Sequence, residues 1–317
     1  MIVVVGSLAL DSVKTPLGSA EAVLGGSGAY FALAARIFAP VSLVAVVGRD
    51  FPDQHLALLA QHGVDVAAVE RADGESFRWG GEYASDLNQR TTLFTHLNVL
   101  ASFQPKLSER LRSARQLFLA NIDPDLQRDV LDQVRGPELV ACDTMNYWIA
   151  SKRDALVRTL ERVQICVLND SEARELAGEA NLWRAADAIL TLGPEIVVIK
   201  KGEHGAILAS RGERFTSPAY PLEMVYDPTG AGDSFAGGFI GYLAAESAAA
   251  EGSNRSGRAE LPSSAVLRRA VVYGTVAASF SVERFSVDGL VGLTRADLDR
   301  RAEELLGHAR WDHAAVQ

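Results

Sequence analysis

The sequence predicts an α/β fold: a doubly wound, mostly parallel central sheet with helices on both faces. Short, continuous apolar runs recur along the 317 residues, a pattern typical of strands that are buried on both faces. Amphipathic stretches separate these runs, and a repeated strand–helix order is typical of doubly wound sheets. Two alternating segments on either side of residues 84–89 predict, in addition, a small β-sheet lid.

The elements follow from these patterns in chain order. The expected strands are the apolar runs at 2–5, 41–48, 116–120, 138–143, 164–169 and 195–202. The expected helices are the amphipathic or small-residue stretches at 28–38, 53–62, 125–134, 151–162, 170–178, 183–191 and 234–245. Thr294 and Asp297 form a capping-box pattern, which predicts a last helix over 295–309. Residues 245–265 are rich in Ser, Gly, Ala and charge, and predict an exposed loop.

Residues 75–98 depart from the strand–helix order. Their two alternating segments predict a hairpin with one wet and one dry face. We therefore expect an α/β core made of 1–10, 24–74 and 99–317, and a β-lid made of 11–23 and 75–98. In open α/β sheets ligands bind in a crevice at the strand ends, and a lid would close it.

Composition excludes several classes of protein. The formal net charge of −9 without a basic stripe argues against nucleic-acid binding. The chain has no window of about 20 apolar residues for a membrane span, and its first residues lack the basic start of a signal peptide. Cys142 and Cys166 each lie in an apolar run, which predicts two buried free thiols. We expect a cytoplasmic protein.

The stretch "DPTGAGDSF", residues 227–235, predicts an anion site. Gly230, Ala231 and Gly232 form a turn with unshielded backbone N–H groups at the positive end of a helix dipole. Asp233 stands inside this site, where its charge would repel an anion. Phosphoryl transfer needs both amides that hold the phosphoryl group and a group that takes the proton of the attacking hydroxyl. The alternative is a simple N-cap after a glycine turn.

Other nucleotide motifs are excluded. The chain has no G-x-x-x-x-G-K-[ST] and no kinase-type H-R-D or D-F-G set. The first strand is followed by "GSLALD", which is not the G-x-G-x-x-G of dinucleotide-binding folds.

Four segments together resemble the ribokinase-like, or PfkB, family of ATP-dependent carbohydrate kinases. They occur in that family's order and spread over most of the chain. The four segments are "LGGSGAYFALAA" (24–35), "VLNDSEARELAG" (167–178), "VVIKKGEHGA" (197–206) and "DPTGAGDSFAGGF" (227–239). The resemblance implies the same α/β core with a β-lid.

The resemblance also implies roles for single residues on the nucleotide side. Asp233 would be the catalytic base, and Gly230, Ala231 and Gly232 the anion hole. Asn169 and Glu172 would order Mg²⁺, largely through water; the alternative is a helix cap with its N3 partner. The residues expected to bind ATP are Lys201, Gly202, Gly205 and Thr229. For Lys201 a solvated strand end is the alternative.

On the acceptor side, the resemblance places Asp11, Gly25 and Gly26 against the hydroxyls of the substrate. Asp227 would lie near the acceptor or near a loop that binds a monovalent cation, for which K⁺ is expected. Many members have Gly-Gly-x-x-Ala-Asn, whereas this chain has Tyr30 at the position of that asparagine. Residues 143–149 also lack the arginine that acid-sugar kinases often carry.

We expect the lid to carry an aromatic face with one cation in it, formed by Phe77, Arg78, Trp79, Tyr83 and Phe94. Trp79 would stack on a sugar ring or a nucleobase, or would pack in a lid-to-lid homodimer. We therefore expect a kinase that transfers the γ-phosphoryl group of ATP to a sugar hydroxyl. The alternatives are a nucleoside kinase of the same fold and a catalytically silent sugar- or nucleotide-binding regulator. The silent regulator ranks last because the base and the anion turn are intact.

Overall fold

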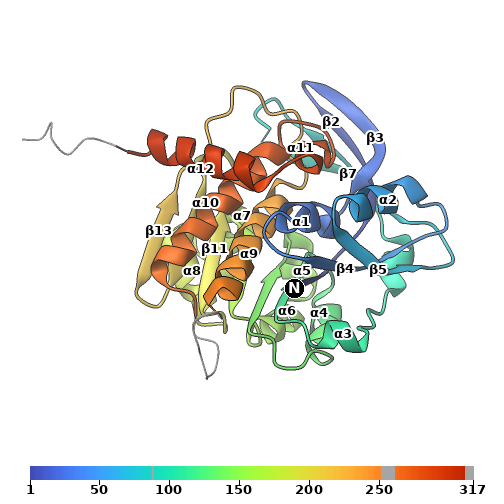
Figure 1. Cartoon of the computed structure of the whole chain (residues 1–317), viewed down its shortest axis with the longest axis horizontal. Coiled ribbons are helices and arrows are strands. Elements are labelled where there is room, and N and C mark those ends of the chain that lie inside the picture. Colours follow the sequence, from blue (N-terminus) through green and yellow to red (C-terminus); the bar gives the residue numbers. More distant parts are fainter. Residues whose placement is uncertain (88, 251–260, 311–317) are drawn as a thin grey trace, which may run out of the picture.

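The computed structural model describes residues 1–87, 89–250 and 261–310, and the expected α/β fold is confirmed. Its large sheet has the strand order β13-β12-β11-β10-β9-β8-β1-β4-β5, and every neighbouring pair from β11 to β5 is parallel (Figure 1). The strands are β1 (Ile2–Val5), β4 (Val41–Val47), β5 (Val64–Arg71), β8 (Gln116–Leu119), β9 (Leu139–Asp143), β10 (Ile165–Asn169), β11 (Ile196–Lys200), β12 (Ala206–Ser210) and β13 (Glu213–Ser217). The last two add to β11 as antiparallel strands.

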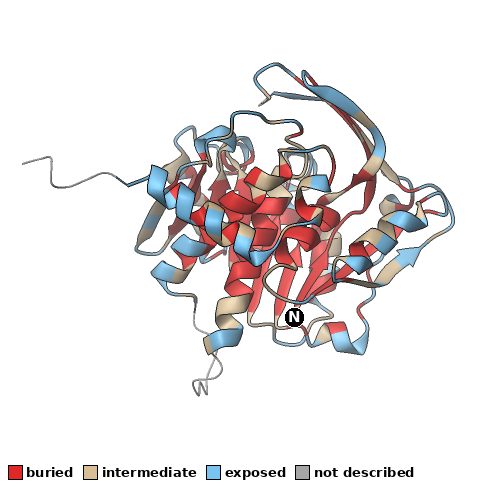
Figure 2. Ribbon diagram, turned by 45° about the horizontal axis from the view of Figure 1, so that its top comes forward, coloured by how far each residue is buried: buried red, intermediate tan, exposed pale blue. Residues whose placement is uncertain are grey.

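The helices cover both faces of this sheet. They are α1 (Ser27–Ala35), α2 (Asp53–Gln61), α3 (Glu109–Arg112), α4 (Pro124–Leu131), α5 (Asn146–Ser151), α6 (Arg153–Leu160), α7 (Asp170–Ala177), α8 (Leu182–Leu190), α9 (Ala231–Ala250), α10 (Ser264–Ser281), α11 (Asp288–Val291) and α12 (Arg295–His308), with short 3-10 turns η1 (Asn98–Ser102) and η2 (Gly202–His204). Alternate residues of each strand enter two separate cores: Ile2 and Val4 pack with α1, α9 and α10, whereas Val3 and Val5 pack with α4 to α8. Figure 2 shows these central strands as buried.

A smaller sheet stands beside the large one, with the order β3-β2-β6-β7. Its strands are β2 (Ala9–Thr15), β3 (Gly18–Gly25), β6 (Phe77–Tyr83) and β7 (Arg90–His96). The two hairpins are antiparallel, and β2 and β6 join them as a parallel pair. The predicted hairpin around residues 84–89 is thus confirmed, with residue 88 outside the described residues.

Some elements differ from the expectation. Residues 245–250 continue α9 and do not form a loop, because alanines and one glutamate favour a helix. Of the rest of that predicted loop, residues 251–260 lie outside the described residues, 261–263 form no helix or strand, and 264–265 begin α10. The sequence patterns did not predict β5, β12, β13 or α10. The expected helix over 151–162 is divided: Ser151 ends α5 and α6 follows, because Lys152, with φ −137° and ψ 37°, leaves the helical region.

The order of the strands reverses beside β1, whose neighbours are β4 on one side and β8 on the other. Such a reversal opens a crevice at the carboxyl ends of the strands, where doubly wound folds bind ligands. Among the helices that the structure describes, none has the length and apolarity needed to cross a membrane. Cys142 and Cys166 are buried free thiols, as expected.

Candidate functional site

Three neighbouring strands of the large sheet each end in a polar residue. Asp143, Asn169 and Lys200 are the last residues of β9, β10 and β11, and Asn169 pairs directly with Lys200. Because these strands are parallel, the three side chains gather at one edge of the sheet. They form the floor of the candidate site.

Lys200 makes a buried ion pair with Asp143. The Nζ–Oδ2 distance is 2.9 Å, and the two side chains are only 14% and 5% exposed. Burial lowers the pKa of Lys200, but the carboxylates of Asp143, Glu172 and Asp233 more than offset it, so the lysine stays charged. A cation is therefore fixed beside the glycine turn: a Cβ on Gly232 would lie 2.9 Å from the Lys200 Nζ.

The glycine turn leads directly into α9, as the sequence predicts. Gly230 has φ +73°, and a Cβ there would lie 2.3 Å from the Tyr30 ring, so only glycine fits. Ala231 donates its N–H to the Pro228 carbonyl at 3.2 Å. The carbonyl of Gly230 accepts from both the N–H and the hydroxyl of Ser234. The remaining N–H groups of this first helical turn point along the helix axis, where an anion is attracted.

Two carboxyl groups at the floor have raised pKa values. Burial and the nearby Asp143 raise the pKa of Asp233 to about 7, against the opposing charge of Lys200. Burial and Asp143 likewise raise the pKa of Glu172 to about 7. Carboxyls with such values are typical of sites that move protons near neutral pH.

Asn169 and Glu172 form the capping box that was the alternative interpretation. The Asn169 Oδ1 accepts the Glu172 N–H at 2.9 Å, and the Glu172 Oε2 accepts the Asn169 N–H at 2.7 Å. The cap uses one carboxylate oxygen, and the charges of Asp143 and Lys200 both act on this carboxyl group. No group of three or more His, Cys, Asp or Glu side chains within the described residues could hold a metal ion by itself. Glu172 offers one carboxylate beside the Asn169 amide, and Mg²⁺ keeps several waters and binds through few carboxylates.

The structure brings Asp11, Gly25 and Gly26 together, as the sequence predicts. A Cβ on Gly25 would lie 1.9 Å from the Asp11 Oδ2, so the carboxylate packs directly on the glycine backbone. Burial raises the pKa of Asp11 to about 7, and the Gly26 N–H acts in the opposite direction. The charges of Asp227 and Asp233 also raise this pKa, so both carboxyls lie near enough to act on Asp11.

Tyr30 lies under the glycine turn. Its side chain is 1% exposed, its ring packs on Gly230, and its hydroxyl has no hydrogen-bond partner in the described structure. Burial, with Asp227 and Asp11 as the next causes, raises the pKa of this phenol well above its usual value. The tyrosine ring therefore supports the glycine turn.

The small sheet turns one face toward these residues. Asp11, Val13 and Thr15 are buried on this face, whereas Lys14 is exposed on the other. Trp79 pairs in register with Asp11 and shares its face. Tyr83, on the same face, reaches the residue just before the glycine turn, where its hydroxyl lies 3.2 Å from the Thr229 Oγ1.

Arg90 on β7 brings a positive charge to the face of the small sheet that carries Asp11 and Trp79, which we call the inner face of the lid. Its guanidinium carbon lies 5.2 Å from the centroid of the Trp79 ring. Its charge lowers the pKa of both Asp11 and Asp233, against the larger effect of burial.

The aromatic residues of the lid lie on two faces, so the expectation of a single aromatic face is wrong. Phe94 packs where a Cβ on Gly80 would lie, on the side opposite Trp79. Arg78 pairs with Asp50 at 2.7 Å and points away from the site. The register of β6 and β7 also shifts at a bulge between Gly80 and Gly81.

Lys201, Gly202 and Gly205 form the turn after β11. The Lys201 N–H donates to the Gly205 carbonyl at 2.7 Å, and Gly205 has φ +80°. The family motif points to Lys201, whereas the lysine that lies near the carboxyls is Lys200. The sequence patterns did not point to Asp143 or Arg90 either. Lys200 and Asp143 each end an apolar strand, and a charged residue at that position is the signal that could have identified both.

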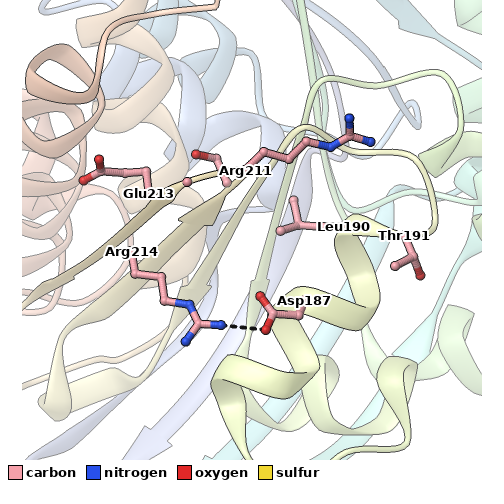
Figure 3. A pocket seen from close by; sticks show the side chains of 8 residues that line it. Asp187, Leu190, Thr191, Arg211, Glu213 and Arg214 are labelled. Atoms are coloured by element: carbon pink, nitrogen blue, oxygen red, sulfur yellow. Dashed lines mark hydrogen bonds and ion pairs between the residues drawn. The ribbon is translucent and has the colours of Figure 1, made fainter.

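Figure 3 shows a separate pocket of about 640 Å³ between the end of α8 and the β12–β13 hairpin. Arg214 and Asp187 form a 2.7 Å ion pair at its edge. Ser210 of this pocket pairs with Ile196, the first residue of β11, whereas Lys200 is the last. The pocket therefore lies at the opposite end of the strand from the candidate site.

Known proteins resemble this chain in sequence and fold. The sequence pattern of the pfkB family of carbohydrate kinases matches residues 1–290. The cytidine kinase of Thermococcus kodakarensis is 30% identical over 244 residues, which cover 75% of this chain and 87% of that enzyme. A Burkholderia thailandensis nucleoside kinase in complex with inosine shares the fold, with a TM-score of 0.77, 18% identity, and coverage of 97% and 98%.

A putative ribokinase II from E. coli, in complex with ATP and Mg²⁺, also shares the fold, with a TM-score of 0.74 and 20% identity. Coverage is 97% of this chain and 99% of that one. The chain therefore belongs to the pfkB family of carbohydrate kinases and is an ATP-dependent phosphotransferase that acts on a hydroxyl group.

Proposed function

We propose that the protein transfers the γ-phosphoryl group of ATP to a hydroxyl of a nucleoside. The observation that carries this proposal is the register between Trp79 and Asp11 on the inner face of the lid. A carboxylate suited to sugar hydroxyls and an indole suited to a flat ring then border the same space. The likeness to a cytidine kinase supports the same substrate class.

In this proposal Asp233 takes the proton of the attacking hydroxyl, and residues 230–232 hold the transferred phosphoryl group. Lys200, 2.9 Å from Asp143, would contribute positive charge beside the same turn. Lys201, Gly202, Gly205 and Thr229 would border the ATP. Mg²⁺ would neutralise phosphate charge while its waters contact Asn169 and Glu172.

The acceptor would lie between the two carboxyls and the lid. Asp11 and the backbone of Gly25 and Gly26 would bind its hydroxyls. Trp79 would stack on the base, with Arg90 at the rim. Tyr30 and Asp227 would shape the space from below. A requirement for K⁺ and a lid-to-lid homodimer remain predictions.

The test is an ADP-release assay with Mg²⁺-ATP against cytidine, uridine, adenosine, inosine, ribose and fructose. Asp233→Asn is the blank, and its turnover should fall by about 10²- to 10⁴-fold or more. Turnover of nucleosides but not of free sugars supports the proposal. Turnover of free sugars alone would favour the sugar kinase alternative.

Trp79→Ala tests the role of the lid. Its acceptor KM should rise about tenfold or more, because the stacking of one base on an aromatic ring is lost. The KM for ATP should change little. Trp183→Ala is the matched control, because Arg214 also lies over that ring, at 5.4 Å, but beside the remote pocket. An unchanged acceptor KM together with a smaller oligomer would assign Trp79 to a dimer contact.

A further inference from the structure

Ser286 lies in the segment between α10 and α11 and has an unusual backbone. Its φ is +57°, although it is not a glycine, and it is only 7% exposed. Left-handed dihedral angles strain a residue with a Cβ, and such strain persists only where the surroundings hold it. The two hydrogen bonds of Ser286 identify what holds it.

These two bonds reach different parts of the proposed site. The Ser286 hydroxyl donates to the Leu24 carbonyl at 2.5 Å, directly before Gly25 and Gly26. The Ser286 N–H donates to the Asp227 Oδ2 at 3.1 Å. The other carboxylate oxygen, Oδ1, accepts the Thr229 N–H at 2.9 Å, at the start of the glycine turn.

The same chain of bonds continues to the lid. The Thr229 hydroxyl lies 3.2 Å from the Tyr83 hydroxyl of β6. At the lid base, Thr15 donates its hydroxyl to the Tyr226 carbonyl at 2.9 Å, and Tyr226 donates its N–H to the carbonyl of Val282 at 2.8 Å. The segment that carries Ser286 therefore contacts the acceptor turn, the catalytic loop and the lid.

We propose that Ser286 is a positioning residue that fixes the acceptor turn, Gly25 and Gly26, against the catalytic turn, residues 230–232. The inference rests on the proposed roles of these two turns. In-line transfer requires the hydroxyl and the phosphoryl group at a defined separation, and a displacement of about 1 Å can cost about 10²-fold in rate. Two turns from distant parts of the chain need a connection of this kind.

Ser286→Gly tests the proposal, because glycine accepts the backbone angle and keeps the N–H bond but loses the hydroxyl. Its kcat should fall about tenfold or more, while the KM values for ATP and acceptor change less than about threefold. Thr159→Val is the matched control. It also loses a buried hydroxyl, which donates to the Pro124 carbonyl at 3.1 Å, and should keep its kcat.

Hydrogen exchange of the free protein gives a readout that needs no substrate. In Ser286→Gly, peptides that cover 23–30 and 226–233 should both exchange faster, while Thr159→Val leaves them unchanged. Unchanged exchange in both peptides overturns the proposal whatever the substrate is. So does a parent-like kcat, or a raised acceptor KM with kcat unchanged. If the glycine variant does not fold, Ser286→Ala removes the same hydroxyl and is measured in its place.

Discussion

Asp233 should make the folded protein less stable as the pH rises, and Asp233→Asn should remove this effect. Burial, with Asp143 next, raises the pKa of this carboxyl from 3.8 to about 7. Between these values the folded chain holds a proton that the unfolded chain has released. The free energy of unfolding therefore falls as the pH rises toward 7 and levels off above it.

The magnitude follows from the two pKa values. Their difference of about three corresponds to about 4 kcal/mol at high pH, at about 1.4 kcal/mol for each pKa unit. Part of this is already lost at pH 5, because the unfolded carboxyl is ionised there. Between pH 5 and pH 8, about 2 to 3 kcal/mol remains for this single group.

Urea unfolding of the parent and of Asp233→Asn, at intervals from pH 5 to pH 8, measures this difference. The stability advantage of the variant should grow by about 2 to 3 kcal/mol over that range. Asp129→Asn, on the exposed side of α4, is the control for loss of one negative charge and should follow the parent. Parallel curves for the parent and Asp233→Asn would refute the reasoning.

Three further predictions concern the surroundings of Asp233. Lys200→Met leaves its buried partner carboxylate unpaired, so the free energy of unfolding in urea should fall by about 3 to 5 kcal/mol at pH 8. The loss should be smaller at pH 5, because Glu172 and Asp233, whose pKa values are about 7, are protonated there and do not need the lysine charge. A loss under about 1 kcal/mol at both pH values would contradict this prediction. Gly25→Ala puts a Cβ 1.9 Å from the Asp11 Oδ2. It should raise the acceptor KM at least tenfold while calorimetry finds unchanged ATP binding, and equal losses for both ligands would count against it. Tyr83→Phe removes the bond to Thr229 and should lower the free energy of unfolding by about 0.5 to 1.5 kcal/mol, with no change at all as the contrary result.

The sequence predicted the parts of the fold that depend on local pattern. The buried strands and the helices between them follow from apolar periodicity, and the glycine turn from its own residues. β12 and β13 were missed because they are short and follow a glycine-rich turn without a helix. β5 was missed because it lies at the edge of the sheet, where its residues are only partly buried.

The candidate site was predictable where a motif places residues next to one another in the chain. Asp233 and residues 230–232 are of this kind. The pairing of Lys200 with Asp143 depends on which strands are neighbours, and no local pattern states that. Which lid residues face the site depends on strand register. The sequence alone therefore does not place Trp79 and Phe94 on opposite faces, whereas the pairing of β6 with β7 does.

The two buried thiols, Cys142 and Cys166, can report how often the core around them opens. Cys142 and Cys166 face each other in register on β9 and β10, in the core that packs on α4 to α8. A thiol reagent can reach them only when that core opens, so its rate of reaction measures the opening equilibrium. Cys142 directly precedes Asp143, at the strand end that forms the floor of the site. Protection of the thiols by added nucleotide would therefore report, without any enzymatic turnover, that a ligand has closed over the end of the sheet.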